Sequence, residues 1–207
     1  MSQVVTVETD TIKENCYIIS DHQDALIIDP GNDSEEIVKA ISALQVTPHA
    51  ILITHAHFDH IGALEVIRTT YQIPVYINQI EQAWLQDPDK NLSSSYRYAF
   101  TCQPAEHVLS PVVNFQIGSF QIEARPTPGH TPGSTSYVFA SERLVFSGDA
   151  LFKHAIGRFD FPEGSETALL NSIRKQLFTL PDDYVVYPGH GLPTTIGQER
   201  ATNPFFR

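Results

Sequence analysis

The chain has 207 residues, which suits one domain, 1–207, with a substantial hydrophobic core and argues against two separate domains. Hydrophobic residues make up 42% and charged residues 18% of the sequence, which excludes the biased composition of disordered or fibrous chains. A net charge of -11 without any basic run disfavours nucleic acid as a partner, although a small anionic substrate is still allowed because the net charge of the chain does not determine the potential inside a single site.

The first part of the chain alternates predicted strands with predicted helices. Short β-branched and aromatic runs bounded by turn formers predict strands at 4–7, 15–20, 25–29 and 49–53. Apolar residues recur at helical spacing from Ile37 to Leu44, so a helix is expected there, with Ser34 as its cap. Residues 63–71 predict a second helix and 73–77 a further strand. This order indicates an α/β layered domain.

The second part begins with a segment of different character. Residues 78–107 hold a helix-like piece, EQAWL, and a long polar loop, and we interpret this segment as an insert or lid. Strands are predicted again at 112–117, 120–125, 135–140 and 143–148. An amphipathic stretch at 167–180 predicts the last helix, and 184–188 the last strand. Two rounds of strands and helices are compatible with the two halves of a sandwich.

The cysteines and the N-terminal segment give two further expectations. Cys16 and Cys102 lie in unlike contexts without CxxC spacing, so neither a disulfide framework nor a thiolate zinc site is expected. The sequence does not open on a basic start followed by an apolar run, and no apolar stretch approaches the roughly 20 residues that span a bilayer. We therefore expect a cytoplasmic protein with no membrane partner.

The strongest chemical signal is THAHFDH at 54–60, which follows a predicted buried strand. Burying imidazoles and a carboxylate so close together without a function would cost desolvation energy. Neutral imidazole and carboxylate are the usual ligands of zinc, manganese or iron. Extended backbone projects His55 and His57 to one side, whereas Asp59 and His60 follow on the turn and can face a second position. One short motif can therefore serve two metal ions.

Three further candidate ligands each come at the end of a predicted strand. They are His130 in PGHTPGS, Asp149 in SGDALF and His190 in PGHG. The surrounding glycine and proline residues make sharp turns that can point a side chain into a cleft beyond the strand ends. With THAHFDH, the chain offers enough ligands for a pair of metal ions.

These motifs, in this order and at these separations, resemble the metallo-β-lactamase superfamily, and the resemblance runs from Asn15 to His190. The segments SGDALFKHAIGRFDF and PGHGLPTTIGQERATNPFF are similar to the short bacterial glyoxalase II-like hydrolases. The resemblance implies an α/β fold, a four-layer αββα sandwich with the metals at one edge of two facing sheets. It also implies a first metal held by His55, His57 and His130, a second held by Asp59, His60 and His190, and Asp149 as the bridge between them.

Such a site supports hydrolysis. Two divalent ions about 3.5 to 4 Å apart lower the pKa of a shared water enough to supply hydroxide at neutral pH. A small thioester such as S-D-lactoylglutathione, or an ester, suits this chemistry because a metal can hold the oxyanion and a thiolate leaves readily. Zinc is the expected metal, with iron or manganese as alternatives, because ligand identity alone does not fix the ion.

Two residues are assigned roles beyond metal binding. Asp59 is the candidate catalytic residue, expected to orient the hydroxide, with proton acceptance as a further hypothesis. Arg158 in GRFDF is a candidate for binding a substrate carboxylate or for buttressing the metal ligands through Asp160. A plain surface ion pair is an equally acceptable role for Arg158.

Several other functions compete with thioester hydrolysis. His55, His130 and Asp149 alone would make a two-histidine, one-carboxylate site, as in a mononuclear non-haem iron persulfide dioxygenase. A β-lactamase, a nuclease and a non-catalytic metal-binding module are weaker alternatives. Full-length glyoxalase II is expected to carry a C-terminal helical region that binds glutathione, and little sequence follows His190 here. The sequence therefore leaves the thiol carrier open, and it does not indicate an oligomeric state.

Overall fold

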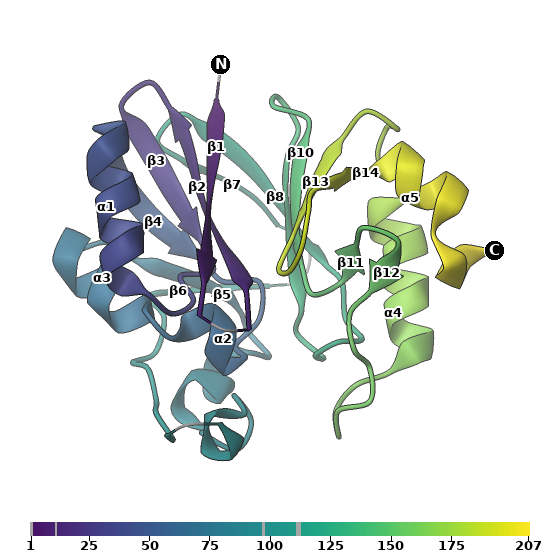
Figure 1. Cartoon of the computed structure of the whole chain (residues 1–207), viewed down its shortest axis with the longest axis horizontal. Helices are drawn as coiled ribbons and strands as arrows, with labels where there is room; N and C mark the ends of the chain where they lie inside the picture. Colours follow the sequence, from purple (N-terminus) through teal and green to yellow (C-terminus); the bar gives the residue numbers. More distant parts are fainter. Residues whose placement is uncertain (1, 11, 97, 111–112) are drawn as a thin grey trace.

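The computed structural model describes residues 2–10, 12–96, 98–110 and 113–207, and these form two six-stranded sheets that lie face to face (Figure 1). The strands of the first sheet are, in spatial order, β1 (Gln3–Thr9), β2 (Glu14–Asp21), β3 (Asp24–Ile28), β4 (Thr47–Leu52), β5 (Val75–Asn78) and β6 (His107–Leu109). Strands β1 to β3 are antiparallel, whereas β3 to β6 are parallel. Parallel neighbours need crossover connections, and α1 (Ser34–Leu44) and α3 (Leu64–Tyr71) supply two of them on the outer face of this sheet (Figure 1).

The second sheet comes from the C-terminal part of the chain. Its strands are, in spatial order, β14 (Thr194–Thr195), β13 (Val185–Pro188), β10 (Leu144–Gly148), β9 (Thr135–Phe139), β8 (Phe120–Pro126) and β7 (Val113–Ile117). Helices α4 (Glu166–Ser172) and α5 (Ile196–Thr202) cover its outer face (Figure 1). A small separate hairpin, β11 (Leu151–Phe152) and β12 (Ala155–Ile156), follows β10.

Three apolar layers hold these elements together. Strand β2 is buried on both faces: Cys16 and Ile18 pack with the residues beneath α1 and α3, while Tyr17 and Ile19 pack between the two sheets. A third cluster joins the second sheet to α4 and α5. Alternate side chains of one strand thus serve two cores, as expected for a sheet covered on both sides. The αββα sandwich implied by the sequence resemblance is confirmed.

The predicted elements are present, with differences at the helix ends. Ser34 is not the cap of the first helix: it is the first helical residue, and Asp33, with φ of 55°, occupies the cap position. The cap side chain is engaged elsewhere, because an Asp33 carboxylate oxygen accepts a hydrogen bond from the Asp10 N–H at 2.6 Å. The helix predicted at 167–180 begins at Glu166, and its last part winds as the π-helix η3 (Ile173–Leu177).

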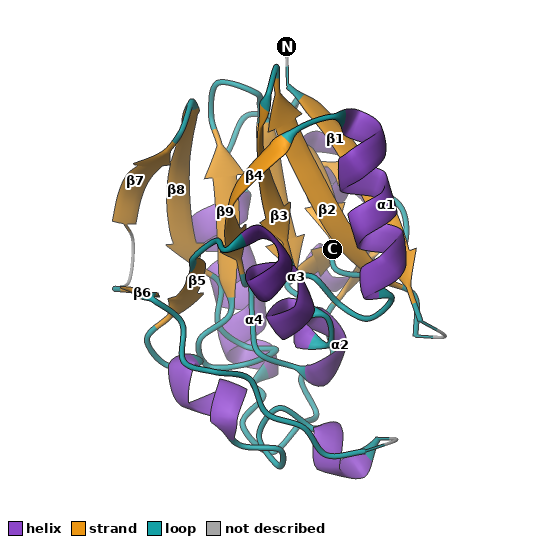
Figure 2. Ribbon diagram, turned by 90° about the vertical axis from the view of Figure 1, so that its left-hand side faces the viewer, coloured by secondary structure: helices purple, strands orange, loops and turns teal. Residues whose placement is uncertain are grey.

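The segment expected as an insert or lid connects β5 to β6 and lies beyond the ends of the strands (Figure 2). It contains the short 3-10 helices η1 (Gln82–Gln86) and η2 (Ser93–Ser95). Trp84 and Leu85 are buried in the core between the first sheet and its helices, so the segment is fixed to the domain at η1. Within the described ranges, no helix is long and apolar enough to cross a membrane.

The layer beneath α1 should dominate the stability of the first half. Ile27 on β3 is fully buried in this layer, so Ile27→Ala removes packed methyl and methylene groups and is expected to lower the free energy of unfolding by about 2–5 kcal/mol. Urea unfolding followed by circular dichroism measures the change. Val66→Ala, on the exposed side of α3, is the control and should stay within about 0.5 kcal/mol of the parent. Equal effects of the two substitutions on the free energy of unfolding would contradict the dominant role of this layer.

Candidate metal centre

The seven predicted ligands meet at one end of the sandwich, where strands of both sheets terminate. His55 and His57 lie on the loop after β4, and Asp59 and His60 lie on the short helix α2 (Phe58–Ile61). Asp149 follows β10 directly, His190 comes two residues after the end of β13, and His130 lies in the loop between β8 and β9. The ends of strands that point the same way share one sheet edge, and loops there can combine residues distant in the sequence. All seven residues are brought together as predicted.

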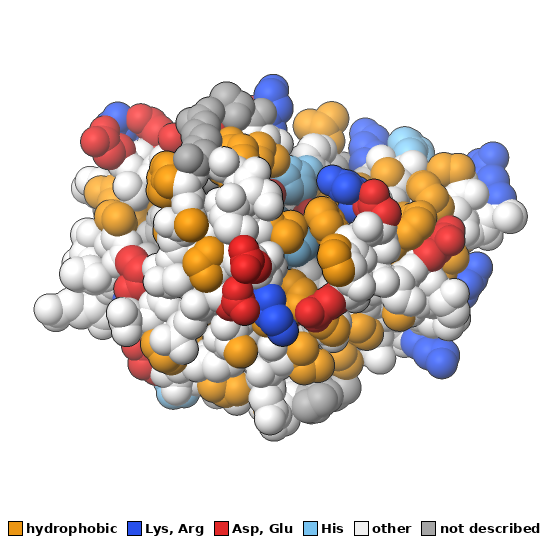
Figure 3. All heavy atoms as spheres, turned by 90° about the horizontal axis from the view of Figure 1, so that it is seen from below, with side chains coloured by type: hydrophobic (Ala, Val, Ile, Leu, Met, Phe, Trp, Pro, Cys, Tyr) orange, Lys and Arg blue, Asp and Glu red, His pale blue; other side chains and the backbone are white. Residues whose placement is uncertain are grey.

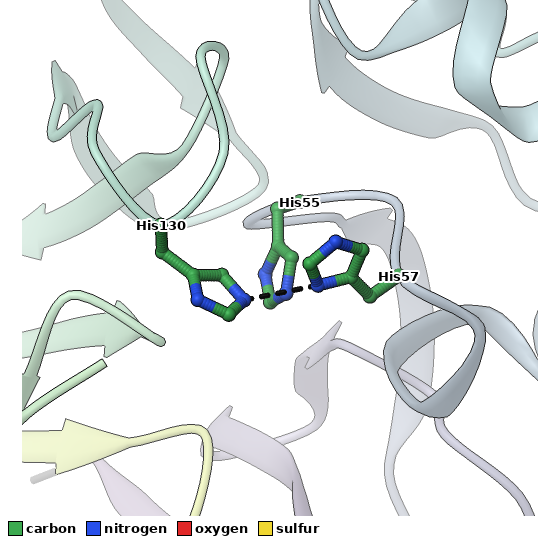
Figure 4. Close-up of side chains that lie close together, drawn as sticks. All are labelled: His55, His57 and His130. Carbon is green, nitrogen blue, oxygen red and sulfur yellow. Dashed lines mark hydrogen bonds between the residues drawn. The ribbon is translucent and has the colours of Figure 1, made fainter. Parts of the chain in front are cut away.

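The first group is formed by three imidazoles from the two halves of the sandwich. Figure 4 shows the His130 ring facing the rings of His55 and His57, with His130 Nε2 2.9 Å from His57 Nδ1. One nitrogen from each ring lies within 4.8 Å of the others. Burial lowers the pKa of all three rings, that of His57 to about 3, and neighbouring imidazoles reinforce the effect. The rings are therefore neutral at pH 7 and present lone pairs.

The second group contains Asp59, His60 and His190, whose donor atoms also lie within 4.8 Å of one another. His190 Nε2 is 3.3 Å from Asp59 Oδ2. Asp149 lies between the two groups: its Oδ1 is 3.5 Å from His60 Nε2, and its Oδ2 is 3.5 Å from His130 Nε2. Although burial opposes ionisation, the nearby imidazole of His60 lowers the pKa of Asp149, so this carboxylate is anionic.

Several donor atoms at this centre make no hydrogen bond within the protein. Among the described residues, His55 Nε2, His60 Nε2 and Asp149 Oδ1 are buried and accept or donate no hydrogen bond. A buried polar atom without a partner costs free energy, and here the unpaired atoms belong to groups that converge. Nitrogen and carboxylate oxygen donors are suited to zinc, iron and manganese. The residues present therefore fit a pair of divalent metal ions.

In four of the five histidines of the centre, Nδ1, the ring nitrogen that points away from the other candidate ligands, lies within hydrogen-bond distance of a protein oxygen. His60 Nδ1 lies 2.9 Å from Asp29 Oδ2, and His55 Nδ1 lies 3.1 Å from Thr54 Oγ1. His130 Nδ1 lies 2.7 Å from the Arg158 carbonyl, and His190 Nδ1 lies 3.2 Å from a main-chain carbonyl oxygen. In a neutral ring, donation of this N–H group leaves the Nε2 lone pair free for the centre.

Asp29 is a functional residue that the sequence reasoning missed. It follows β3, and its carboxylate accepts hydrogen bonds from the Thr54 N–H at 2.7 Å and the Thr54 hydroxyl at 2.6 Å, besides its contact with His60. It therefore fixes both ends of the THAHFDH motif. The available signal was its position: an aspartate that ends a buried strand before Pro30 and Gly31.

Glu81, also missed, joins the two ligand loops of the first group. It is fully buried, and its carboxylate accepts hydrogen bonds from the Ala56 N–H at 3.0 Å, the Thr131 hydroxyl at 2.7 Å and the Gly133 N–H at 2.9 Å. Ala56 separates His55 from His57, and Thr131 follows His130. Nothing local marks Glu81, because its partners lie 25 to 52 positions away.

Arg158 contacts the centre differently from the sequence hypothesis. Its guanidinium makes two hydrogen bonds to Asp160, at 2.9 and 3.0 Å, and lies over the Phe161 ring at 4.4 Å. Its link to a candidate ligand is the main-chain carbonyl that accepts from His130, so the buttress does not run through the Asp160 side chain. Arg158 does line the cleft, and substrate binding by its side chain stays a prediction.

A cleft of about 280 Å³ opens onto these groups. Figure 3 shows histidine side chains at the bottom of a hollow bordered by hydrophobic side chains, with basic and acidic side chains adjacent at its rim. The apolar part of the cleft is lined by Ile12, Phe58, Leu92, Phe152 and Phe161. A small molecule can therefore reach the candidate metal ligands, while most of the wall around it is apolar.

Known proteins share this arrangement. The family model of the metallo-β-lactamase superfamily matches residues 10–190. The chain belongs to the metallo-β-lactamase superfamily. Two superfamily relatives, each named as a probable metallo-hydrolase, match nearly the whole chain. The relative from Streptococcus pyogenes serotype M6 is 43% identical over 93% of this chain and 85% of its own, and YqgX from Bacillus subtilis is 44% identical over 94% and 92%.

Two solved structures and one further relative extend the comparison within the superfamily. The BLEG-1 B3 metallo-β-lactamase is 44% identical, with a TM-score of 0.95 over 99% of both chains. TTHA1623, solved in a di-iron-bound form, is 32% identical, with a TM-score of 0.85 over 97% of this chain and 99% of that one. Hydroxyacylglutathione hydrolase GloC from Haemophilus influenzae is 33% identical over 93% of this chain and 92% of its own.

The Glu81 contacts generate a prediction about metal affinity. Glu81→Gln replaces an acceptor oxygen by an NH₂ group that faces N–H donors, so the loops of the first group should loosen and the affinity for Zn²⁺ should fall about 10- to 100-fold. Competition with a chromogenic chelator measures the affinity of each variant for Zn²⁺. Glu35→Gln, on the exposed face of α1, is the matched control. A Zn²⁺ affinity equal to that of the control would rule out the positioning role of Glu81.

Proposed function

We propose that this protein is a metal-dependent hydrolase of small thioesters, for which S-D-lactoylglutathione is the reference compound. The observation that carries the proposal is the position of Asp149 between two sets of three converging donors, each containing a neutral or hydrogen-bonded imidazole. The relatives named as metallo-hydrolases support hydrolysis, and the name of GloC supports a thioester. The apolar cleft favours a small organic substrate over a polymer.

The candidate ligands would be distributed between two metal ions as the family resemblance implies. His55, His57 and His130 would hold one ion, Asp59, His60 and His190 the other, and Asp149 both. When bound, two such ions supply an activated water at neutral pH and stabilise the oxyanion that forms on the substrate carbonyl. We propose zinc as the native metal; the di-iron form of TTHA1623 keeps iron as the alternative.

Residues of the chain itself orient the attacking water and exclude other water from the cleft. Burial opposes the ionisation of Asp59, but the imidazole of His60 lowers its pKa, so this carboxylate is anionic and can accept a hydrogen bond from the attacking water. Phe58, Leu92 and Phe152 cover the cleft beside it and limit the access of other water. Arg158, at the edge of the same cleft, is positioned to bind a polar part of the substrate.

Metal content and hydrolysis together test the proposal. The purified protein should contain two metal ions per chain by elemental analysis and hydrolyse S-D-lactoylglutathione. His55→Ala should reduce kcat/KM by more than about a hundredfold, since even partners outside the ligand set typically change activity 10- to 100-fold. One iron per chain, no hydrolysis, and oxygen consumption with a persulfide would instead establish a dioxygenase. Bound metal with no turnover of any substrate would establish a binding module.

Asp59→Asn tests the role of the carboxylate in chemistry. The amide keeps the shape but loses the negative charge, so kcat should fall about a hundredfold or more while metal content is retained. Steady-state kinetics and elemental analysis on the same preparation separate the two effects. Asp183→Asn, an exposed aspartate paired with Arg143, serves as the control. An unchanged kcat in Asp59→Asn would remove the proposed role.

A second candidate function is β-lactam hydrolysis, which the likeness to the BLEG-1 B3 metallo-β-lactamase favours. A lactam amide and a thioester both pass through an oxyanion, so the same centre can serve either. Nitrocefin turnover measured beside the thioester assay separates them: hydrolysis of nitrocefin alone would overturn the thioester proposal in favour of the lactamase.

A further inference from the structure

A second cavity, of about 140 Å³, opens from the main cleft beside the first group of histidines. The two cavities share His57, Leu92, His130 and Phe161 as lining residues. A substrate whose reacting carbonyl lies at this shared boundary therefore extends into both cavities, one on each side of the bond that breaks. The proposed hydrolysis assigns no role to the residues that line only the smaller cavity.

The walls of the smaller cavity are apolar and come from both halves of the sandwich. Trp84 and Leu92 belong to the segment between β5 and β6, while Phe161 and Pro162 belong to the segment before α4. Trp84 is only 5% exposed, and its ring lies 6.1 Å from that of His57. The Phe161 ring lies 5.1 Å from that of His57. We call Trp84, Leu92, Phe161 and Pro162 the apolar recess.

The mouth of the recess carries two acidic side chains and one basic side chain. Lys90 Nζ lies 3.6 Å from Glu163 Oε1, and 45% and 46% of these side chains are exposed. Asp89 adds a second carboxylate at the same mouth, so its net charge is negative. In the described part of the chain, the only other Lys or Arg that lines either cavity is Arg158, and Asp160 pairs with it. Among the described residues, an anionic group entering the recess therefore finds no unpaired Lys or Arg side chain.

We propose that the apolar recess binds the acyl group of the substrate and selects a short, uncharged, aliphatic acyl group, while the larger cleft binds the thiol carrier. This inference rests on the proposed thioester hydrolysis. In that reaction water adds to the carbonyl carbon, the C–S bond breaks, sulfur leaves with the bonding pair and is protonated, and a carboxylic acid remains. The smaller half of the substrate occupies the smaller cavity because the bulkier carrier does not fit there.

The recess discriminates by burial. An aliphatic branch gains free energy on leaving water, whereas a hydroxyl in its place is desolvated against Leu92, Phe161 and Pro162, whose side chains offer it no hydrogen-bond partner. Isobutyryl and lactoyl groups have nearly the same shape and differ by a methyl in place of a hydroxyl. The isobutyryl thioester is therefore preferred by about tenfold in kcat/KM. A succinyl thioester is hydrolysed more slowly than either, because the mouth is negative.

Binding can be measured without turnover, because Trp84 is the only tryptophan of the chain. The metal-loaded protein is titrated with two ketone analogues that cannot be hydrolysed, S-(3-methyl-2-oxobutyl)- and S-(3-hydroxy-2-oxobutyl)-N-acetylcysteamine. Both should change the tryptophan fluorescence, the methyl analogue at about tenfold lower concentration. Equal affinities, or no change in fluorescence on saturation, would overturn the recess as the acyl site.

Two variants test the lining. Leu92 has φ of 66°, a conformation that asparagine tolerates well, so Leu92→Asn adds polarity without added backbone strain. It should abolish the preference for the methyl analogue, while the exposed control Val66→Asn keeps it. Glu163→Lys makes the mouth positive and should raise the succinyl to isobutyryl ratio of kcat/KM about tenfold, with Glu35→Lys as the control. A ratio unchanged in Glu163→Lys, with the methyl preference unchanged in Leu92→Asn, would overturn the inference.

Hydrolysis of isobutyryl-, lactoyl- and succinyl-N-acetylcysteamine by the parent protein distinguishes this inference from the function on which it rests. Hydrolysis of all three at equal kcat/KM would overturn acyl selection and leave the thioesterase proposal standing. Hydrolysis of none, with nitrocefin or a persulfide consumed, would overturn the thioesterase proposal itself. The order isobutyryl, lactoyl, succinyl supports both.

Discussion

The structure depends on holding imidazole and carboxylate lone pairs against one another inside a buried cavity. Such groups lose hydration and face like partial charges, which is unfavourable without both outer hydrogen bonds and an ion at the centre. The outer bonds are supplied by Asp29, Thr54 and main-chain carbonyls, each of which fixes one nitrogen of a histidine. Among the described residues of the centre, His55 Nε2, His60 Nε2 and Asp149 Oδ1 are buried without a hydrogen bond. This asymmetry is the physical signature of a metal centre.

The sandwich supplies the rigidity that this arrangement needs. The ligand loops come from different sheets, so the apolar layer between the sheets fixes their separation. Polar links between the sheets add to it at the centre itself. The Tyr17 hydroxyl donates to the Pro188 carbonyl at 2.6 Å and the Asn15 amide donates to the same oxygen at 3.0 Å, which ties β2 to the loop that carries His190. Glu81 ties together the loops that carry His57 and His130.

One glycine shows how closely the two halves approach at the centre. Gly148 has φ of +49°, and a Cβ there would overlap the side chain of Thr54. A larger residue would push the β10 end away from the THAHFDH loop and would be strained in this conformation. Gly148 therefore allows Asp149 to reach both groups of histidines. The same close approach brings the segment before α4 against the segment after β5, and this contact forms the apolar recess.

The sequence by itself determined the candidate ligand motifs and most of the elements, because both are local properties. Strand and helix periodicity is set by neighbours a few positions apart, and THAHFDH carries several ligands in one loop. The residue at the cap position of α1 could not be predicted, because the side chain of Asp33, which has a positive φ, interacts with Asp10, which is distant in the sequence. Only the tertiary structure revealed Asp29 and Glu81 as positioning residues and placed Trp84 in the apolar recess beside His57. Their roles arise from contacts across the sandwich, and no local pattern encodes such contacts.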